Sequence, residues 1–257
     1  MSRYANARRE ATVEGRRAVL EALRGDRTVQ SVLIAEGTEV GPQLRELIAT
    51  AAARSVAVVN VSRDALDKRA ATKHHQGVIA LVEDARYSHL QEIIEAAHAT
   101  GDAPLIVVLD GIQDPQNFGA IARTVDAAGG HGMVAAERRA VGVTPGSVRA
   151  SAGALEHVPV ARVVNISRAI EDLKAAGFWV VGLDMAGSRP YTSVDMTRPV
   201  AIVVGSEGEG ISRLVKEKCD FIVSIPMKGK LGSLNASAAA AVVLFEVVRQ
   251  REAAVNT

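Results

Sequence analysis

From residue 104 to the end of the chain, short uninterrupted apolar runs alternate with stretches whose apolar residues recur every three or four positions. Unbroken apolar runs are typical of strands buried on both faces of a mostly parallel sheet, and the wider spacing is typical of helices that cover it. The predicted strands are Leu105–Leu109, Gly132–Ala136, Val158–Val163, Phe178–Leu183, Val200–Val204 and Phe221–Ile225. The predicted helices are about Asn117–Ala128, Ser167–Ala176 and an alanine-rich segment that begins near Ala236. The pattern therefore predicts an α/β domain over residues 104–257.

The first part of the chain has shorter elements, which together predict a separate, smaller α/β domain over residues 13–84. Its predicted helices are Glu14–Leu23, Pro42–Arg54 and Asp64–Ala71. Its predicted strands are Val29–Ala35, Val56–Val61 and Gly77–Val82. Residues 1–12 are polar and are expected to be disordered or frayed. Residues 85–103 are expected to be a linker that carries a helix from about Leu90 to Ala99. A chain of 257 residues is long enough for two such domains.

The composition narrows the class of protein. With 48% hydrophobic and 23% charged residues, the chain has the balance of a globular protein. A single cysteine, Cys219, excludes an internal disulfide and a site with several thiolate ligands from one chain. No apolar run approaches the roughly 20 residues that cross a bilayer, and the N-terminus lacks the apolar core of a signal peptide. We expect a cytoplasmic protein.

The net charge of +1 does not by itself indicate a nucleic-acid partner, but the charges are unevenly distributed. Residues 1–30 hold seven arginines against four acidic residues, and a second basic cluster runs from Arg63 to Lys73. Both clusters are compatible with binding to phosphate or with an ordinary solvated surface. The stretch Lys73–Gly77, with adjacent His74 and His75, suits either RNA contacts or a turn. Adjacent histidines lack the i, i+4 spacing of a helical metal site, so no metal is expected.

Two loops that follow apolar strands in the second domain carry candidate chemistry. In the first, Asn117 stands where a helix N-cap is expected, and Arg123 is the lone arginine on a helical stretch of mostly small and apolar residues. Arg123 is either a partner for a phosphate or a solvated charge. The second loop, Gly205–Gly210, has the spacing G-x-x-G-x-G, which is not the G-x-G-x-x-G of dinucleotide-binding sites. Within it, Glu207 is either a positioned carboxylate or a turn residue.

A third loop lies between the strand that ends at Pro226 and the alanine-rich helix, which Ser233 or Asn235 can cap. Its glycines do not have the spacing of a P-loop. Ligands of open α/β sheets bind beyond the carboxyl ends of the strands, so the three loops together predict one composite pocket. The residues alone thus predict a ligand-binding α/β domain that follows a small, partly basic one.

At these loops the sequence resembles the SpoU (TrmH-type) family of RNA 2′-O-ribose methyltransferases, in the SPOUT superfamily. The matching motifs are Asn117–Thr124 (NFGAIART), Val203–Gly210 (VVGSEGEG), and Ile225–Met227 (IPM) followed by Ser233–Ser237 (SLNAS). Ser151–Pro159 (SAGALEHVP) and His75–Gly77 are also similar to the family. The resemblance covers about residues 14–251. Within the family, the two-domain layout is most similar to bacterial 23S rRNA guanosine 2′-O-methyltransferases.

The resemblance implies a fold, a cofactor and an assembly. The second domain would be a SPOUT domain with a trefoil knot, and the first an L30e-like RNA-binding domain. S-adenosylmethionine would lie in the knot against Gly205, Ile225 and Leu234. The protein would be a homodimer through its C-terminal domain, with active sites that take residues from both subunits.

The resemblance also implies roles for individual residues. Arg123 would assist removal of the ribose 2′-hydroxyl proton, and Asn117, Glu207, Ser233 and Asn235 would orient the ribose and that arginine. The candidate RNA-binding residues are Arg16, Lys73, His75 and Gln76. The substrate that the resemblance implies is a guanosine of 23S rRNA. The alternatives are a tRNA ribose or an rRNA adenosine. A non-catalytic RNA-binding or ribosome-assembly factor is the alternative from another class.

Overall fold

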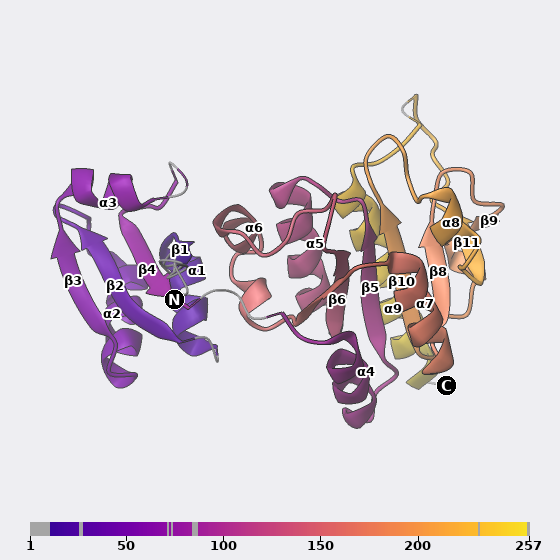
Figure 1. Cartoon of the computed structure of the whole chain (residues 1–257), viewed down its shortest axis with the longest axis horizontal. Helices are drawn as coiled ribbons and strands as arrows, with labels where there is room; N and C mark the ends of the chain where they lie inside the picture. The colour runs from indigo at the N-terminus through magenta and orange to yellow at the C-terminus, as the bar shows by residue number, and fades with distance from the viewer. Residues whose placement is uncertain are drawn as a thin grey trace, which may run out of the picture. The chain divides into compact units, whose positions relative to one another are not determined.

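The computed structural model describes residues 11–25, 28–70, 72, 74–83, 87–230 and 232–255. The chain divides into two compact units, residues 1–86 and residues 87–257 (Figure 1). Among the described residues, none of the helices has the length and apolar character that crossing a membrane requires.

The first unit is built on a mixed four-stranded sheet of order β1-β4-β2-β3. β4 is antiparallel to both of its neighbours, whereas β2 and β3 are parallel. The strands and helices are β1 (Ala11–Glu14), α1 (Arg16–Arg24), β2 (Val29–Ala35), α2 (Pro42–Ala53), β3 (Ala57–Val61), α3 (Arg63–Arg69) and β4 (Val78–Val82).

Among the described elements of this unit, β1 is the one that the sequence pattern misses. Ala11 and Thr12, which the pattern assigns to a disordered N-terminus, begin this strand and pair with Val82 and Leu81 of β4. The strand is only four residues long, so its alternation is too short to recognise. Its order comes from the ladder with β4, which is a tertiary contact.

The second unit is a seven-stranded sheet of order β7-β6-β5-β10-β8-β11-β9, in which every strand pair is parallel. Its strands are β5 (Leu105–Asp110), β6 (Gly132–Ala136), β7 (Val160–Val163), β8 (Trp179–Leu183), β9 (Arg189–Pro190), β10 (Val200–Gly205) and β11 (Phe221–Ser224). Its helices are α4 (Leu90–Ala99), α5 (Pro115–Ala127), α6 (Pro145–Ala150), α7 (Ile166–Ala175), α8 (Arg213–Lys216) and α9 (Ala236–Val255). The predicted parallel α/β fold is confirmed.

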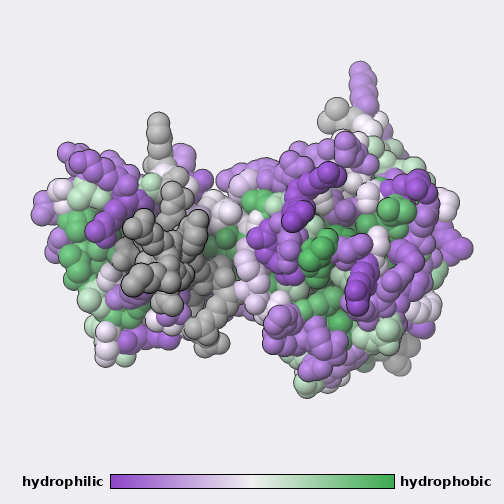
Figure 2. Space-filling view, viewed as in Figure 1, coloured by the Kyte–Doolittle hydropathy of each residue, from purple (hydrophilic) through white to green (hydrophobic). Residues whose placement is uncertain are grey.

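Helices cover both faces of this sheet (Figure 1). Val107 and Leu109 of β5 face a core that includes Phe118 of α5 and Leu244 of α9. The residues of β5 that alternate with these face a second core, which is formed with α4, α7 and α8. Successive strand side chains point to opposite faces, so a strand buried on both sides must be apolar throughout, as the unbroken runs predict. On the visible face of this unit, hydrophilic side chains predominate between small hydrophobic patches (Figure 2).

The strand order places a topological switch between β5 and β10. The chain adds β6 and β7 on one side of β5, whereas β8 and β11 lie beyond β10 on the other side. The loops after β5 and β10 therefore run away from each other at this point, which is where open α/β sheets bind their ligands.

Two short helices were not predicted from the pattern. α6 has six residues and α8 has four, which is less than two helical turns, so neither shows a readable period. Thr144 is the N-cap of α6, and its side chain accepts a hydrogen bond from the amide of Ser147. It packs on α5 at Gly119, where a Cβ atom would come within 2.4 Å of the Ser147 carbonyl oxygen. The helix is stabilised by this contact and not by local sequence alone.

Candidate active site

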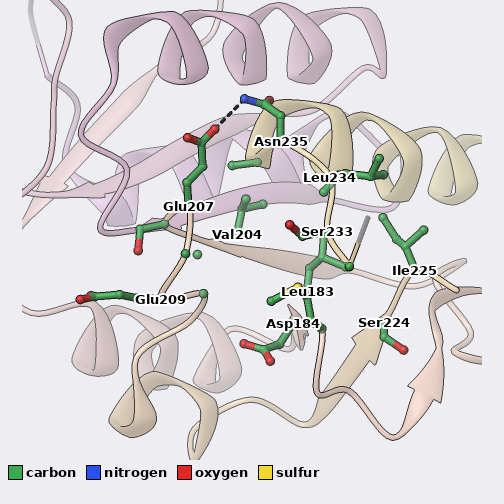
Figure 3. Close-up of a pocket in the computed structure, with 18 of the residues that line it drawn as sticks. Leu183, Asp184, Val204, Glu207, Glu209, Ser224, Ile225, Ser233, Leu234 and Asn235 are labelled. Carbon is green, nitrogen blue, oxygen red and sulfur yellow. Dashed lines mark hydrogen bonds between the residues drawn. The ribbon is translucent and has the colours of Figure 1, made fainter. Parts of the chain in front are cut away.

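A cavity of about 740 Å³ opens at the carboxyl edge of the second sheet (Figure 3). It is lined by 183–185 after β8, 204–210 after β10, 224–227 after β11, 232–236 before and at the start of α9, and the side chains Lys216 and Ala239. Two of the three predicted loops therefore form one pocket. The loop after β5, which is the other predicted loop, does not line the cavity. The loop after β8 lines it, although the sequence pattern did not indicate this loop.

The loop after β10 is shaped by glycine. A Cβ atom on Gly205 would come within 2.1 Å of the backbone carbon of Gly210, so only glycine allows the two ends of the loop to meet. Ser206 and Gly210 exchange backbone hydrogen bonds of 3.1 and 3.0 Å. Gly208 and Gly210 have φ values of 88° and 68°, a region that favours glycine. This tight loop places Glu207 near its tip, beside the cavity (Figure 3).

Three of the predicted catalytic residues form a closed hydrogen-bond network. The Asn117 side-chain amide donates to Glu207 Oε1 at 2.7 Å, and the Asn235 amide donates to the same oxygen at 2.6 Å. Asn235 also donates to Asn117 Oδ1 at 2.9 Å. Asn117 lies in the first turn of α5, whereas Glu207 and Asn235 come from the loops after β10 and β11, and the sequence predicts that all three lie at one edge of the sheet. Each holds the other two in place.

The helix caps separate the roles of the two asparagines. Asn117 is not the cap of α5, because Asp114 holds that position and accepts from the amide of Gln116 at 3.0 Å. The amide group of Asn117 is thus free to enter the network. Asn235 takes part in the network and also caps α9. Its Oδ1 accepts hydrogen bonds from the backbone amides of Ser237 and Ala238, as the sequence predicts.

Of the remaining predicted catalytic residues, Ser233 is exposed and lines the cavity, whereas Arg123 does not. Arg123 lies on α5 six residues after Asn117, which corresponds to roughly 9 Å along the helix axis and to a different helix face. Its side chain is exposed and forms no ion pair with any part of the chain that the structure describes. The fold of one chain therefore does not bring Arg123 to the network.

Asp184, at the end of β8, is a pocket residue that the sequence analysis missed. It accepts hydrogen bonds from Lys216 Nζ at 2.7 Å and from the backbone amides of Ala186 and Ile211 at 2.9 and 3.4 Å. Burial alone would raise the pKa of Asp184, but these hydrogen bonds and the Lys216 charge hold it below its ordinary value. The signal that could have found it is its place directly after an apolar strand of a parallel sheet.

In the first unit, two of the candidate RNA-binding residues lie at one shallow, polar cavity of about 470 Å³. Arg16 donates to the Glu39 carbonyl oxygen at 3.1 Å, and its backbone amide donates to Gln76 Oε1 at 3.3 Å. Gln76 holds a φ of 53°, which is uncommon for a residue with a side chain. Arg63 also lines this cavity. Both candidates are thus presented to solvent at one place.

The other two candidates differ. His75 is 6% exposed, and both of its ring nitrogens are occupied. Nδ1 accepts from the Gly77 amide at 3.1 Å, so Nε2 carries the proton that faces Asp67 Oδ1 at 2.9 Å. This geometry assigns the His75 ring to holding the turn together, and its contact with RNA stays a prediction. Lys73 lies outside the described residues.

Two other possible sites of chemistry are absent or inert. Within the described ranges there is no cluster of three histidine, cysteine or acidic side chains that could hold a metal ion. Burial raises the pKa of the Cys219 thiol to about 12, with Asp220 adding to the effect. A thiol held protonated in this way is a poor nucleophile.

Comparisons with known proteins give a consistent result. Residues 104–245 match the SpoU rRNA Methylase family, and residues 12–88 match the RNA 2′-O ribose methyltransferase substrate binding domain. The putative TrmH family tRNA/rRNA methyltransferase YacO of Bacillus subtilis is 44% identical over 93% of this chain and 95% of its own length.

Two solved structures are similar over nearly the whole chain. The SpoU methyltransferase AviRb from Streptomyces viridochromogenes has a TM-score of 0.80 and 31% identity, over 95% of this chain and 91% of its own. An AdoMet-bound rRNA methyltransferase from Sinorhizobium meliloti has a TM-score of 0.77 and 29% identity, over 93% and 87%.

Proposed function

The chain belongs to the SpoU family of RNA methyltransferases, and from this premise we propose that it methylates a ribose 2′-hydroxyl of RNA with S-adenosylmethionine as the methyl donor. The observation that carries the proposal is the hydrogen-bonded network of Asn117, Glu207 and Asn235 beside the cavity. A non-catalytic RNA-binding factor would have no need to hold a carboxylate and two amides in a fixed arrangement at the mouth of a pocket.

The cavity fits the proposed cofactor. Its volume of about 740 Å³ lies within the usual range for small-molecule sites, roughly 300–1,000 Å³. Gly205 removes the side chain that would otherwise crowd the loop behind the cavity, and Ile225 and Leu234 contribute apolar lining opposite it. We assign these three residues to cofactor binding. When bound, the cofactor supplies the electrophilic methyl group.

The network would orient the ribose. Glu207 Oε1 is saturated by two amide donors, which leaves its other oxygen to accept a hydrogen bond from a ribose hydroxyl. Ser233, exposed at the rim, would provide a second polar contact. A hydroxyl that is held in line with the methyl group reacts faster, because binding has already fixed the relative orientation of the two reacting groups.

Arg123 would act across a homodimer interface. α9 packs against α5 and presents Val242 (36% exposed) and Phe245 (49% exposed) to solvent, although large apolar side chains are usually buried. A dimer that covers this face would bring Arg123 of one subunit toward the cavity of the other. There its guanidinium would clamp a phosphate or assist loss of the hydroxyl proton. The trefoil knot and the L30e-like character of the first unit belong to the same proposal.

The proposed substrate is a guanosine of 23S rRNA, with tRNA ribose or rRNA adenosine as the alternatives. The test uses S-adenosylmethionine labelled in its methyl group, with unmodified 23S rRNA and, separately, total tRNA. A 2′-O-methyl group blocks alkaline cleavage of the next phosphodiester, so an alkali-resistant labelled dinucleotide reports ribose methylation and names the base.

Label on guanosine of rRNA would support the proposal, and label in tRNA or on adenosine would replace the substrate while keeping the reaction. Label in an alkali-sensitive product would contradict ribose methylation. If neither RNA is labelled and no cofactor binds in equilibrium dialysis, the non-catalytic reading is favoured.

A further inference from the structure

The segment Glu137–Thr144, which joins β6 to α6, carries two arginines that neither the pocket nor the network uses. Arg138 and Arg139 are exposed, and neither has an ion-pair or hydrogen-bond partner in the described part of the chain. Exposed arginines on flexible loops are ordinary. In this segment, however, hydrogen bonds hold the backbone on both sides of the two arginines.

The backbone on both sides of the two arginines is anchored. The Glu137 amide donates to the Val163 carbonyl oxygen at 2.9 Å, and the Val141 amide donates to the Ile112 carbonyl oxygen at 2.9 Å. The first bond ties the segment to β7, and the second ties it to the loop after β5.

Further along, two more side chains fix the same segment. The Val143 amide donates to the Tyr87 hydroxyl oxygen at 2.9 Å, and the Ser147 hydroxyl donates to the Gly142 carbonyl oxygen at 2.9 Å. A Cβ atom on Gly142 would lie 2.4 Å from the Tyr87 hydroxyl, so the fit is close. The backbone that carries the two arginines is therefore held by hydrogen bonds before and after them.

Arg139 itself is held in a strained conformation. Its φ is 58°, in the left-handed region where glycine or asparagine is preferred. Strain of this kind persists where the surrounding structure enforces it, and it concentrates at binding sites. Here it directs an arginine outward at a position where glycine would be easier to accommodate.

The position of the segment indicates its partner. β6 and β10 flank β5, so the loops that follow β6 and β10 are about two strand spacings apart, roughly 10 Å. The carboxylates of Asp114, Glu207 and Glu209 are exposed at this same edge and would repel a polyanion. One exposed carboxylate, Glu137, also precedes the arginines. Cationic groups near the ribose site must therefore outweigh these charges if RNA is to approach.

We propose that Arg138 and Arg139 form a phosphate-binding site that holds the RNA backbone within a few nucleotides of the ribose to be methylated. The inference rests on the proposed function, because it takes RNA to be the substrate. Guanidinium groups suit this task, since their planar array of donors matches phosphate oxygens in pairs. A rigid backbone reduces the entropy that is lost when the contact forms.

The test combines Arg138→Ala with Arg139→Gly in the full-length protein. Glycine accepts the left-handed conformation without strain, so the second change should not lower the melting temperature. We expect KM for transcribed 23S rRNA to rise about tenfold per arginine, with kcat and the dissociation constant of S-adenosylmethionine unchanged within about twofold. The slope of log affinity against log salt should become shallower by roughly two, one for each phosphate contact.

The matched control is the double variant Arg198→Ala, Lys218→Ala. It removes the same two charges, but from positions just before β10 and β11, at the opposite edge of the sheet. Its KM for RNA should change by less than about threefold, since long-range charge effects are screened. Equal effects of the two double variants would overturn the proposed site and show that only net charge matters.

Failure of the inference and failure of the proposed function are distinguishable. If the wild-type protein methylates RNA and the variant of the arginine pair matches it, the function stands and this site does not. If the wild-type protein methylates neither RNA, filter binding of transcribed 23S rRNA still decides the point. A shallower salt slope in that assay supports the phosphate site, and an unchanged slope excludes it.

Discussion

The second unit holds two sets of polar side chains that differ in whether their hydrogen-bond partners lie within the chain. Asn117, Glu207 and Asn235 complete one another's hydrogen bonds within one chain. Arg123, Arg138 and Arg139 are exposed, without a partner in the described residues.

This contrast distinguishes the preformed part of the site from the part that a ligand completes. A network that is satisfied within the chain keeps its geometry before any ligand arrives, and it also contributes to folding. An exposed guanidinium contributes little to folding, and its charge is neutralised only by a group from outside. Changes to the first set should therefore alter both stability and turnover, whereas changes to the second should alter function alone.

The largest expected effect is that of Arg123→Ala. Loss of a guanidinium that acts on the reacting hydroxyl or its phosphate should lower kcat by about 10²–10³-fold. The melting temperature and the affinity for S-adenosylmethionine should stay the same, because Arg123 lies outside the cavity. The measurements are single-turnover methyl transfer, thermal unfolding and equilibrium dialysis. A fully active variant would remove Arg123 from the mechanism.

The second prediction separates the two roles of Asn235. Asn235→Ser keeps a side-chain oxygen that can cap α9 but removes the amide that binds Glu207 and Asn117, whereas Asn235→Ala removes both. We expect methyl transfer to fall about 10–100-fold in both variants, because Glu207 loses its fixed position. Only the alanine variant should lose the capping contribution, about 1 kcal/mol of unfolding free energy.

Urea unfolding measures the difference in unfolding free energy between the serine and alanine variants, and methyl transfer is measured in parallel. Equal stability of the two variants would mean that the cap contributes nothing. Full activity of the serine variant would mean that the network does not orient the substrate.

A smaller effect is expected at the ion pair of Lys216 and Asp184. The pKa of Asp184 is depressed in the folded state, so the pair contributes stability above the unfolded carboxyl pKa, about 3.9. That contribution is lost as the pH falls through the folded pKa. Because Lys216 is partly exposed and Asp184 keeps its backbone hydrogen bonds, Lys216→Met should lower the unfolding free energy by about 1 kcal/mol at pH 7.

The difference in unfolding free energy between wild type and Lys216→Met should shrink as the pH falls below about 3.9, and it should disappear below the depressed pKa of folded Asp184, where both proteins carry a neutral carboxyl. Urea unfolding at several pH values measures it. Lys218→Met is the control, since Lys218 pairs with Glu171 at the surface and its loss should change stability little. A loss for Lys216→Met that does not depend on pH would argue against the ion pair as its cause.

The extent to which the site could be predicted depends on the kind of signal. Asn117, Glu207 and Asn235 stand after apolar strands, and the rule that parallel strands end at one edge is enough to group them. Asp184 follows the same rule but has no glycine-rich loop to draw attention to it. The anchoring of Arg138 and Arg139 leaves no local signal, because their supports come from Tyr87, Ile112 and Val163, which are distant in sequence.

Elements with a strong hydrophobic pattern could be predicted from the sequence alone. Val29–Ala35, Gly132–Ala136 and Leu90–Ala99 form as predicted, because burial imposes a period that can be read from a short window. The sequence also determined the family, through three motifs in order.

Tertiary contacts, which leave no local pattern in the sequence, set the order of the strands, the short elements β1, α6 and α8, and the partners of polar side chains. The structure showed that Asp114 and not Asn117 caps α5, and that His75 is buried against Asp67. A hydrogen bond between residues 90 or 118 positions apart, such as those of Asn117, has no periodic trace in the sequence. Such bonds arise when the chain is folded, because only then do distant loops meet at the same edge of the sheet.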